Sequence, residues 1–393
     1  MCFSVGRRTS VSFMQSLLNP YPWFKTMREQ NPVYFDQTIG SWVVFRYADV
    51  KQVMTDYEHF SSAPPDRGDG MNMFANSMLM TDPPRHRQLR SLVNLAFTPR
   101  MIEQLHDRID GLVNRLLDDM LAQPEPDFIR DFATPLPMTV IAEMLGVPTA
   151  DQDKFKYWTE QIITSSNNPD MSKIVPIYQE FGAYLFGMIE QRRNAPQADL
   201  ISDLLNAQID GESLSDMDLI GFCALLLVAG NETTTNLLGN AVRVFSEQPA
   251  IYAELRANPS LIPNVLDETL RYYSPVKAMP RHAHTEQQIG DVTILAGQRV
   301  MAVIGSANRD ESQFPDAETF DLHRKGNQHI AFGHGIHYCL GAPLARLEGK
   351  LALEAMLKRI ETITIKPDAQ LEPIPTPITF GVKNLPVLIT TSE

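Results

Sequence analysis

The sequence is short of cysteine and has no excess of positive charge. Only Cys2, Cys223 and Cys339 occur among its 393 residues, an odd number without paired spacing. A disulfide framework is therefore not expected, and a reducing compartment fits better. The formal net charge is −13, which argues against nucleic acid as a partner, because binding to a phosphate backbone needs a basic face.

Long hydrophobic segments are also missing. The longest apolar run, residues 219–230, is too short to span a membrane, and the N-terminal residues lack the apolar stretch of a signal peptide or anchor. We therefore expect a cytoplasmic protein without a membrane anchor. Since the sequence has no internal repeat, low-complexity tract or linker, residues 1–393 are expected to form a single domain.

The spacing of apolar residues predicts a mostly helical chain. We expect helices at residues 22–30, 101–121, 136–146, 152–165, 173–193, 216–247, 262–273 and 343–360. Alternating patterns predict a strand pair within 33–47 and further strands within 289–304 and 360–390. Residues 61–80 have no period, so they are predicted to form a long loop of the kind that is often functional. The expected fold class is mainly α with a smaller β-rich portion.

Cys339 lies in a glycine-rich stretch, residues 332–341 (FGHGIHYCLG), directly before a predicted helix. The three glycines permit positive φ angles and a close approach of the backbone, so a tight loop around the cysteine is expected. The amide groups and the positive dipole end of the following helix favour a thiolate at Cys339. With Phe332 nearby as an apolar shield, the loop suits a cysteine that ligates a metal.

Three other interpretations of Cys339 remain open on the residues alone. A single cysteine in a glycine-rich turn is often a buried structural residue. A zinc site would need more ligands than His334 and His337 supply, because no second cysteine lies near in the sequence. Acylating catalysis by a cysteine and a histidine is the third interpretation, and it lacks a local sequence signature.

A second unusual stretch interrupts the apolar pattern of the helix predicted at 216–247. Residues 229–236 (AGNETTTN) place a glycine and three consecutive threonines in a helix interior, where both residue types are unfavourable. The charge of Glu232 beside a buried run costs free energy unless it is used. Such local conflicts often mark functional sites, although a solvent-facing polar patch with a glycine kink has the same spacing.

The stretch 332–341 resembles, position by position, the haem-binding signature of the cytochrome P450 superfamily. The matching residues are Phe332, Gly333, Gly335, Cys339 and Gly341, with His337 as in bacterial members. The resemblance extends over nearly the whole chain and implies the cytochrome P450 fold, with haem b between the helix at 216–247 and the helix after the cysteine. It implies that Cys339 ligates the haem iron as a thiolate, and that Phe332, Gly333 and Gly341 contact the cofactor.

The same resemblance implies roles for residues elsewhere in the chain. Residues 229–236 are similar to the family's oxygen-binding helix, in which Ala229 and Gly230 would line the oxygen pocket. Glu232 and Thr233 would then form an acid–alcohol pair that delivers protons. The haem propionates would be held by His86, Arg90, Arg281 and His337. A structural network, a buried Glu-x-x-Arg pair with a third partner, is matched by Glu268, Arg271 and Arg324.

The chain looks most like soluble bacterial monooxygenases that hydroxylate steroids, terpenoids and fatty acids. This implies a hydrophobic small-molecule substrate and electrons from a separate ferredoxin-type or flavodoxin-type donor with its reductase, since no flavin or iron–sulfur domain is attached. Lys277 stands where relatives usually have an apolar residue, and we expect its ammonium to reach away to solvent rather than to meet an acidic substrate. The substrate pocket is expected from residues 61–80 and 165–180 together with Leu226, Ala229, Thr233, Val276, Met279 and Thr379.

Two other functions remain alternatives for a haem–thiolate protein. A peroxide-driven hydroxylase would need no redox partner, but peroxide-adapted relatives lose the acid–alcohol pair that Glu232 and Thr233 match. A non-catalytic haem–thiolate sensor would be expected to carry a signalling domain, and the chain has no residues left over for one.

Overall fold

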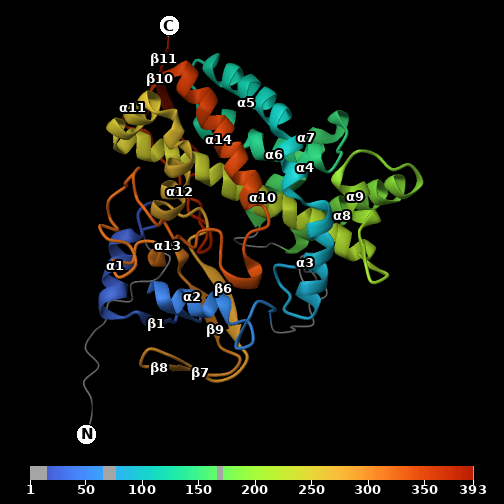
Figure 1. Cartoon of the computed structure of the whole chain (residues 1–393), viewed down its shortest axis with the longest axis horizontal. Helices are drawn as coiled ribbons and strands as arrows, with labels where there is room; N and C mark the ends of the chain where they lie inside the picture. Colours follow the sequence, from blue (N-terminus) through green and yellow to red (C-terminus); the bar gives the residue numbers. More distant parts are fainter. Residues whose placement is uncertain (1–15, 65–76, 166–170, 393) are drawn as a thin grey trace.

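The computed structural model describes residues 16–64, 77–165 and 171–392. A mainly helical body carries a smaller β-rich part at one end (Figure 1), which confirms the predicted fold class. The α-helices are α1 (Tyr21–Gln30), α2 (Tyr47–Thr55), α3 (Arg85–Ala96), α4 (Pro99–Gln104), α5 (His106–Leu121), α6 (Pro135–Met144), α7 (Gln152–Ser165), α8 (Met171–Asn194), α9 (Leu200–Asn206), α10 (Asp216–Glu247), α11 (Pro249–Ala257), α12 (Ile262–Tyr272), α13 (Ile304–Ala307) and α14 (Ala342–Arg359).

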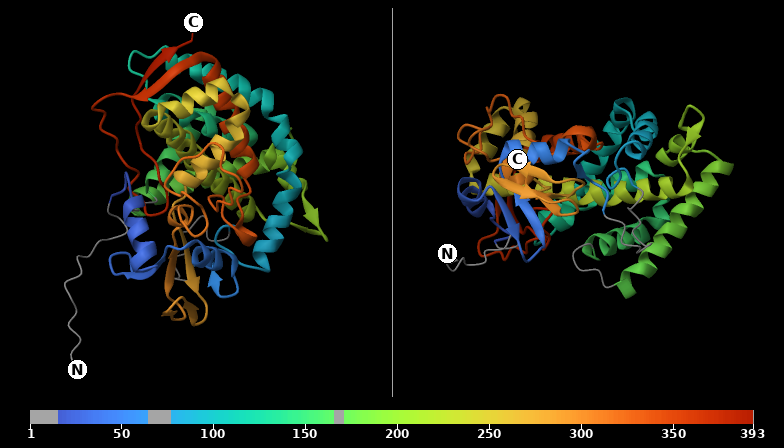
Figure 2. Two further views of the ribbon diagram at one scale, coloured as in Figure 1. Left: turned by 60° about the vertical axis from the view of Figure 1, so that its left-hand side comes forward. Right: turned by 90° about the horizontal axis from the view of Figure 1, so that it is seen from below.

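The described strands form one sheet of five strands, in the order β1-β2-β9-β6-β3, and three two-stranded sheets. The five-stranded sheet lies at the end of the helical body away from the C-terminus (Figure 1 and the left view of Figure 2). The strands are β1 (Val33–Asp36), β2 (Ser41–Val44), β3 (Phe60–Ser61), β4 (Gln208–Ile209), β5 (Glu212–Ser213), β6 (Met279–Ala283), β7 (Gln287–Ile289), β8 (Val292–Ile294), β9 (Arg299–Ala302), β10 (Ile360–Ile365) and β11 (Val387–Thr391).

The strand pair predicted within residues 33–47 is the antiparallel pair β1–β2. Asp36 faces Ser41 at the closed end of the hairpin, and Gly40 supplies the positive φ angle of 59° that the turn requires. β2 then pairs with β9 in parallel, with Trp42 opposite Val300. The sheet therefore joins the start of the chain to its last third.

Helix α10 is the central element of the fold and has the bounds predicted from the sequence. Ser215 and Asp218 begin it with a capping box: the amide of Asp218 donates to the Ser215 hydroxyl at 3.2 Å, and the Ser215 amide donates to the Asp218 carboxylate at 2.9 Å. Residues 219–224 and 234–245 are buried, and the helix crosses the middle of the helical body (Figure 1). Its apolar composition is thus used in the core.

The helix predicted over residues 101–121 is two helices in the structure. Thr98 caps α4 by accepting from the amide of Met101 at 3.2 Å. At its other end the amide of Leu105 donates to the carbonyl of Ile102, three residues earlier, at 3.1 Å. This tighter turn ends α4, and α5 begins at His106. The apolar stripe continues across the break, which is why the period alone does not reveal it.

Candidate functional site

The cysteine loop, residues 332–341, closes on itself directly ahead of α14. The amide of Cys339 donates to the carbonyl of Phe332 at 2.8 Å. Gly333 has a φ angle of 79°, and a Cβ there would lie 3.3 Å from the carbonyl oxygen of His337. A side chain at this position would be strained and crowded, so the loop needs glycine.

The sulfur of Cys339 lies at the N-terminal end of α14. Desolvation by the surrounding protein has the largest influence on the pKa of this thiol and raises it. The backbone amides of Gly341 and Ala342 donate to the sulfur, and together with the charge of Arg90 they lower the pKa by less. The amides at the helix start therefore favour the thiolate form, while the loss of water opposes it more strongly. A metal cation on the sulfur would reverse this balance.

Three of the predicted substrate residues lie along one face of α10. Leu226, Ala229 and Thr233 are spaced by three and four residues, which aligns them on a helix. Ala229 is exposed although the segments of α10 on either side are buried, so protein side chains do not cover this face. The hydroxyl of Thr233 donates to the carbonyl of Ala229 at 2.7 Å, within the helix itself.

Gly230 has a packing role that the sequence does not reveal. The resemblance predicts that it lines an oxygen pocket beside Ala229. In the structure, a Cβ at this position would lie 2.7 Å from Cδ1 of Ile141 in α6. The glycine therefore allows α6 and α10 to pack closely together, and this contact accounts for it independently of any pocket.

Glu232 turns toward the C-terminal part of the chain. Its Oε1 accepts a hydrogen bond of 2.7 Å from the hydroxyl of Thr379, 147 residues away in sequence, and Thr379 forms a β-bridge with Val276. Burial raises the pKa of the Glu232 carboxyl, and the bond from Thr379 lowers it by less. The sequence pairs Glu232 with Thr233, whereas the structure joins it to Thr379. Met279, which follows Val276 by three residues and begins β6, is partly exposed.

Two histidines meet where α3 begins. The rings of His86 and His337 lie edge to face, with their centres 4.4 Å apart. His86 is 3% exposed, and its Nε2 has no hydrogen-bond partner among the described residues. Burial lowers the pKa of His86 to about 4, and the charges of His337 and Arg90 add to this effect. The buried Nε2 is thus suited to a further polar group.

Arg90 and Arg281 complete the set of predicted propionate partners. Arg90 follows His86 by one turn of α3, and its charge acts on both His86 and Cys339. Arg281 is buried in β6, and burial lowers the pKa of its guanidinium to about 10, while the charge of Asp82 raises it. The fold therefore gathers cationic side chains from α3 and β6 near the cysteine loop.

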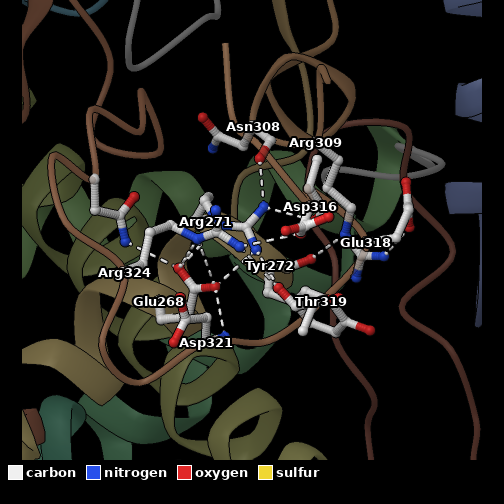
Figure 3. A network of polar contacts seen from close by, with 12 residues as sticks. Glu268, Arg271, Tyr272, Asn308, Arg309, Asp316, Glu318, Thr319, Asp321 and Arg324 are labelled. Carbon is white, nitrogen blue, oxygen red and sulfur yellow. Dashed lines mark hydrogen bonds and ion pairs between the residues drawn. The ribbon is translucent and has the colours of Figure 1, made fainter. Parts of the chain in front are cut away.

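The predicted structural network forms as a buried cluster (Figure 3). Arg271 is completely buried and donates to Glu268 through Nε at 2.9 Å and Nη2 at 2.7 Å. The Nε of Arg324 donates to the two carboxylate oxygens of Glu268 at 3.1 and 3.2 Å. The remaining donors of Arg271 reach the carbonyl oxygens of Asn308, Ala317 and Thr319 at 2.8–2.9 Å.

The sequence predicts that Lys277 reaches solvent, but in the structure it does not. The residue is 2% exposed, and burial lowers the pKa of its ammonium to about 8. A Cβ on Gly305 would lie 3.4 Å from Cβ of Lys277 and 3.6 Å from Cε2 of Phe24, so the side chain starts out between α13 and α1. A local sequence pattern does not indicate this burial.

Part of the predicted substrate pocket lies outside the described residues. This holds for residues 65–76 of the predicted loop and for residues 166–170 between α7 and α8. A surface groove of about 640 Å³ lies elsewhere, between α3–α4 and α9–β4, and none of the predicted substrate residues lines it.

The structure also contains a buried acid that sequence reasoning missed. Glu348 in α14 is 1% exposed, and the hydroxyl of Thr234 in α10 donates to its carboxyl group. Its Oε1 has no partner within the described part of the chain. Burial raises the pKa of Glu348 from 4.5 to about 8, against the weaker effect of Thr234. The burial of Glu348 results from the contact between α10 and α14, which are distant in sequence, so the sequence does not indicate it.

The raised pKa of Glu348 predicts a pH-dependent stability. Between pH 4.5 and about 8 the folded state holds a proton that the unfolded state has released, so the free energy of unfolding falls as the pH rises. We expect Glu348→Gln to gain about 1.4 kcal/mol relative to the wild type for each pH unit in this window. Denaturant unfolding of both proteins at pH 5, 6, 7 and 8 measures the difference, and parallel profiles would contradict the prediction.

The family model of cytochrome P450 matches residues 25–391. The chain therefore belongs to the cytochrome P450 family. Members of this family are haem b proteins, and the chain is a cytochrome P450 monooxygenase. Among the described helices, α10 is long and apolar enough to cross a membrane, and 56% of its most apolar window is buried inside the protein.

Several known proteins resemble the chain along most of their length. Cytochrome P450 109 of Bacillus spizizenii is 42% identical over 381 residues, which cover 95% of this chain and 92% of the relative. The erythromycin C-12 hydroxylase of Saccharopolyspora erythraea is 39% identical, with 94% of each chain covered. The crystal structure of CYP109E1 from Bacillus megaterium in complex with testosterone superposes with a TM-score of 0.86 at 37% identity, covering 94% of this chain and 99% of that one.

Proposed function

We propose that this chain, as one catalytic domain spanning residues 1–393, hydroxylates a hydrophobic small molecule with electrons from a separate protein. The observation that carries the proposal is the closed cysteine loop, in which the amides of Gly341 and Ala342 donate to the sulfur of Cys339. The proposed electron donor is of the ferredoxin or flavodoxin type with its reductase, and the proposed location is the cytoplasm.

The described residues fit a haem b group. Cys339 would ligate the iron, with Phe332, Gly333 and Gly341 of its loop against the cofactor. His86, whose buried Nε2 has no partner among the described residues, would bind a propionate, and the other proposed propionate partners nearby are Arg90, Arg281 and His337. When bound, haem supplies the reactivity toward dioxygen that no amino-acid side chain provides.

The chain's own chemical contribution is to hold and deliver protons. Burial raises the pKa of Glu232, which brings a carboxyl group closer to the range in which it exchanges protons near neutral pH. Thr379 orients the carboxyl through its hydrogen bond. Thr233, the next residue along α10, is the proposed alcohol partner, and exposed Ala229 keeps the adjacent face of the helix accessible.

A steroid is the proposed first choice among the hydrophobic substrates. CYP109E1, which resembles this chain, holds testosterone in its crystal structure, and apolar residues at the proposed pocket, Leu226, Val276 and Met279, suit a flat hydrocarbon skeleton. Terpenoids and fatty acids share this chemistry. The erythromycin C-12 hydroxylase acts on a macrolide, which makes a macrolide the competing class.

An optical titration of the purified haem protein tests the proposal. Testosterone, a terpenoid, a long-chain fatty acid and erythromycin are added separately while the main haem absorption band is followed. A saturable shift with testosterone supports a steroid pocket, whereas a shift with another compound alone assigns that class instead. A protein that holds no haem after reconstitution would overturn the proposed site.

The acid–alcohol pair separates the monooxygenase from the peroxide-driven alternative. We expect Glu232→Gln to slow turnover with dioxygen and a ferredoxin system by about 100-fold, the scale of a lost proton donor, and to leave peroxide-driven turnover little changed. Glu247→Gln, at the far end of the same helix, is the control and should leave both rates unaltered. A wild type that turns over faster with peroxide than with ferredoxin would favour the alternative.

A further inference from the structure

Asp82, directly ahead of α3, is the centre of a set of polar contacts that the proposed function does not use. Its carboxylate accepts a hydrogen bond from the hydroxyl of Ser61 and one of 3.1 Å from the amide of Ser62. Its Oδ1 also lies 4.0 Å from Nε2 of His337, within the range of an ion pair. The carboxylate thus ties the last residue of β3, and the residue after it, to the cysteine loop.

Ser62 connects the same two segments a second time. Its hydroxyl lies 2.9 Å from Nε2 of His337, while its amide is held by Asp82. One ring nitrogen of His337 is therefore fixed by Ser62 and faces Asp82, and Nδ1 on the other side of the ring can be offered to a further acceptor.

The main chain of Asp82 acts on the second histidine. Its carbonyl oxygen accepts from the amide of His86 at 3.0 Å, which fixes the first turn of α3. The ring of His86 then packs edge to face against His337 at 4.4 Å. A single residue therefore anchors both histidines, one through its side chain and one through its backbone.

Asp82 remains ionised in these surroundings. Burial by itself would raise the pKa of the carboxyl, but contacts with His337, Ser61 and the amides of Ser62 and Ala63 outweigh burial and lower it. Its negative charge also acts on the buried guanidinium of Arg281. A fixed anion therefore stands among the residues proposed to receive the two anionic haem propionates.

We propose that Asp82 is a positioning residue for haem: it holds His337 and His86 in the orientation in which they bind the propionates. This inference rests on the proposed haem site. Charge alone argues the other way, because an anion next to the propionates repels them. If Asp82 acted only through its charge, neutralising it would tighten haem binding. If it acts by orienting the histidines, neutralising it loosens haem binding, so the sign of the effect separates the two accounts.

The test measures the rate at which the intact protein loses haem to an excess of an apoprotein acceptor. We expect Asp82→Asn to lose haem about tenfold faster than the wild type, the lower end of the effect of removing a partner that orients a metal-site residue. Ser62→Ala, which removes only the hydroxyl that contacts His337, should shift the rate in the same direction by less. This second variant keeps the test valid if Asp82→Asn folds poorly.

Two controls make the result specific. Asp56→Asn disrupts a comparable pair elsewhere, in which Nδ1 of His59 lies 2.8 Å from the Asp56 carboxylate, and it should leave the rate unchanged. In a His337→Gln background, Asp82→Asn should have little further effect, since the side chain that it orients is gone. An unchanged or slower rate for Asp82→Asn would overturn the inference, while a wild type without haem would overturn the proposed function instead.

Discussion

Replacing Cys339 by serine is expected to abolish the haem–thiolate absorption signature of the reduced carbon-monoxide complex and to reduce hydroxylation to background. A serine hydroxyl does not ionise near neutral pH, so it cannot supply the electron density that a thiolate gives to the iron. The backbone amides of Gly341 and Ala342 would remain in place, so the loop should keep its shape. Difference spectra of the reduced protein and product analysis measure the two losses.

Cys223 provides the matched control for this experiment. It lies in α10, is 0% exposed, and burial raises the pKa of its thiol to about 12. Cys223→Ser is expected to lose some stability, because a hydroxyl replaces a buried thiol, but to keep the thiolate signature in full. A Cys339→Ser protein that still showed the signature would place the iron ligand at another residue.

Arg271→Met is expected to cause a large loss of stability although the residue lies outside the proposed haem site. The methionine removes one of the two cationic partners of the buried Glu268 and leaves Arg324 as the other. It also leaves the carbonyl oxygens of Asn308, Ala317 and Thr319 without the donors that they have now. Breaking a buried ion pair from one side costs about 3–5 kcal/mol. Denaturant unfolding, followed by circular dichroism, measures the change in the free energy of unfolding.

An exposed ion pair is the control for the buried one. Nζ of Lys366 lies 3.1 Å from the carboxylate of Glu125, and the two side chains are 48% and 82% exposed. Lys366→Met should change stability little, because water screens such a pair. If Arg271→Met proved as mild as Lys366→Met, the network around Glu268 would not hold this part of the fold together.

Elements with a long, regular pattern were predictable from the sequence. The bounds of α10 follow from its apolar run and from the capping residues Ser215 and Asp218. The β1–β2 hairpin follows from alternation on both sides of Gly40. The division between α4 and α5 at Leu105 was not predictable, because one tightened turn leaves the apolar stripe unbroken.

Within the site, the sequence identified single residues better than their partners. It singled out Cys339 and Glu232, since a cysteine among glycines and an acid in an apolar helix are locally unusual. It did not indicate that Glu232 binds Thr379 or that Thr234 binds Glu348, because these contacts join segments that are remote along the chain. The role of Gly230 likewise depends on Ile141, a residue of another helix.

The parallel pairing of β2 with β9 has a consequence for the synthesis of the protein. The hydroxyl of Ser41 reaches the carbonyl of Arg299, 258 residues further along the chain. At the usual pace of translation a ribosome needs about 10–50 s to make that length. During this interval the β1–β2 hairpin has emerged with one edge unpaired, and such an edge invites pairing with other chains. Nascent chains of this protein are therefore expected to depend on chaperones until residue 302 has left the ribosome.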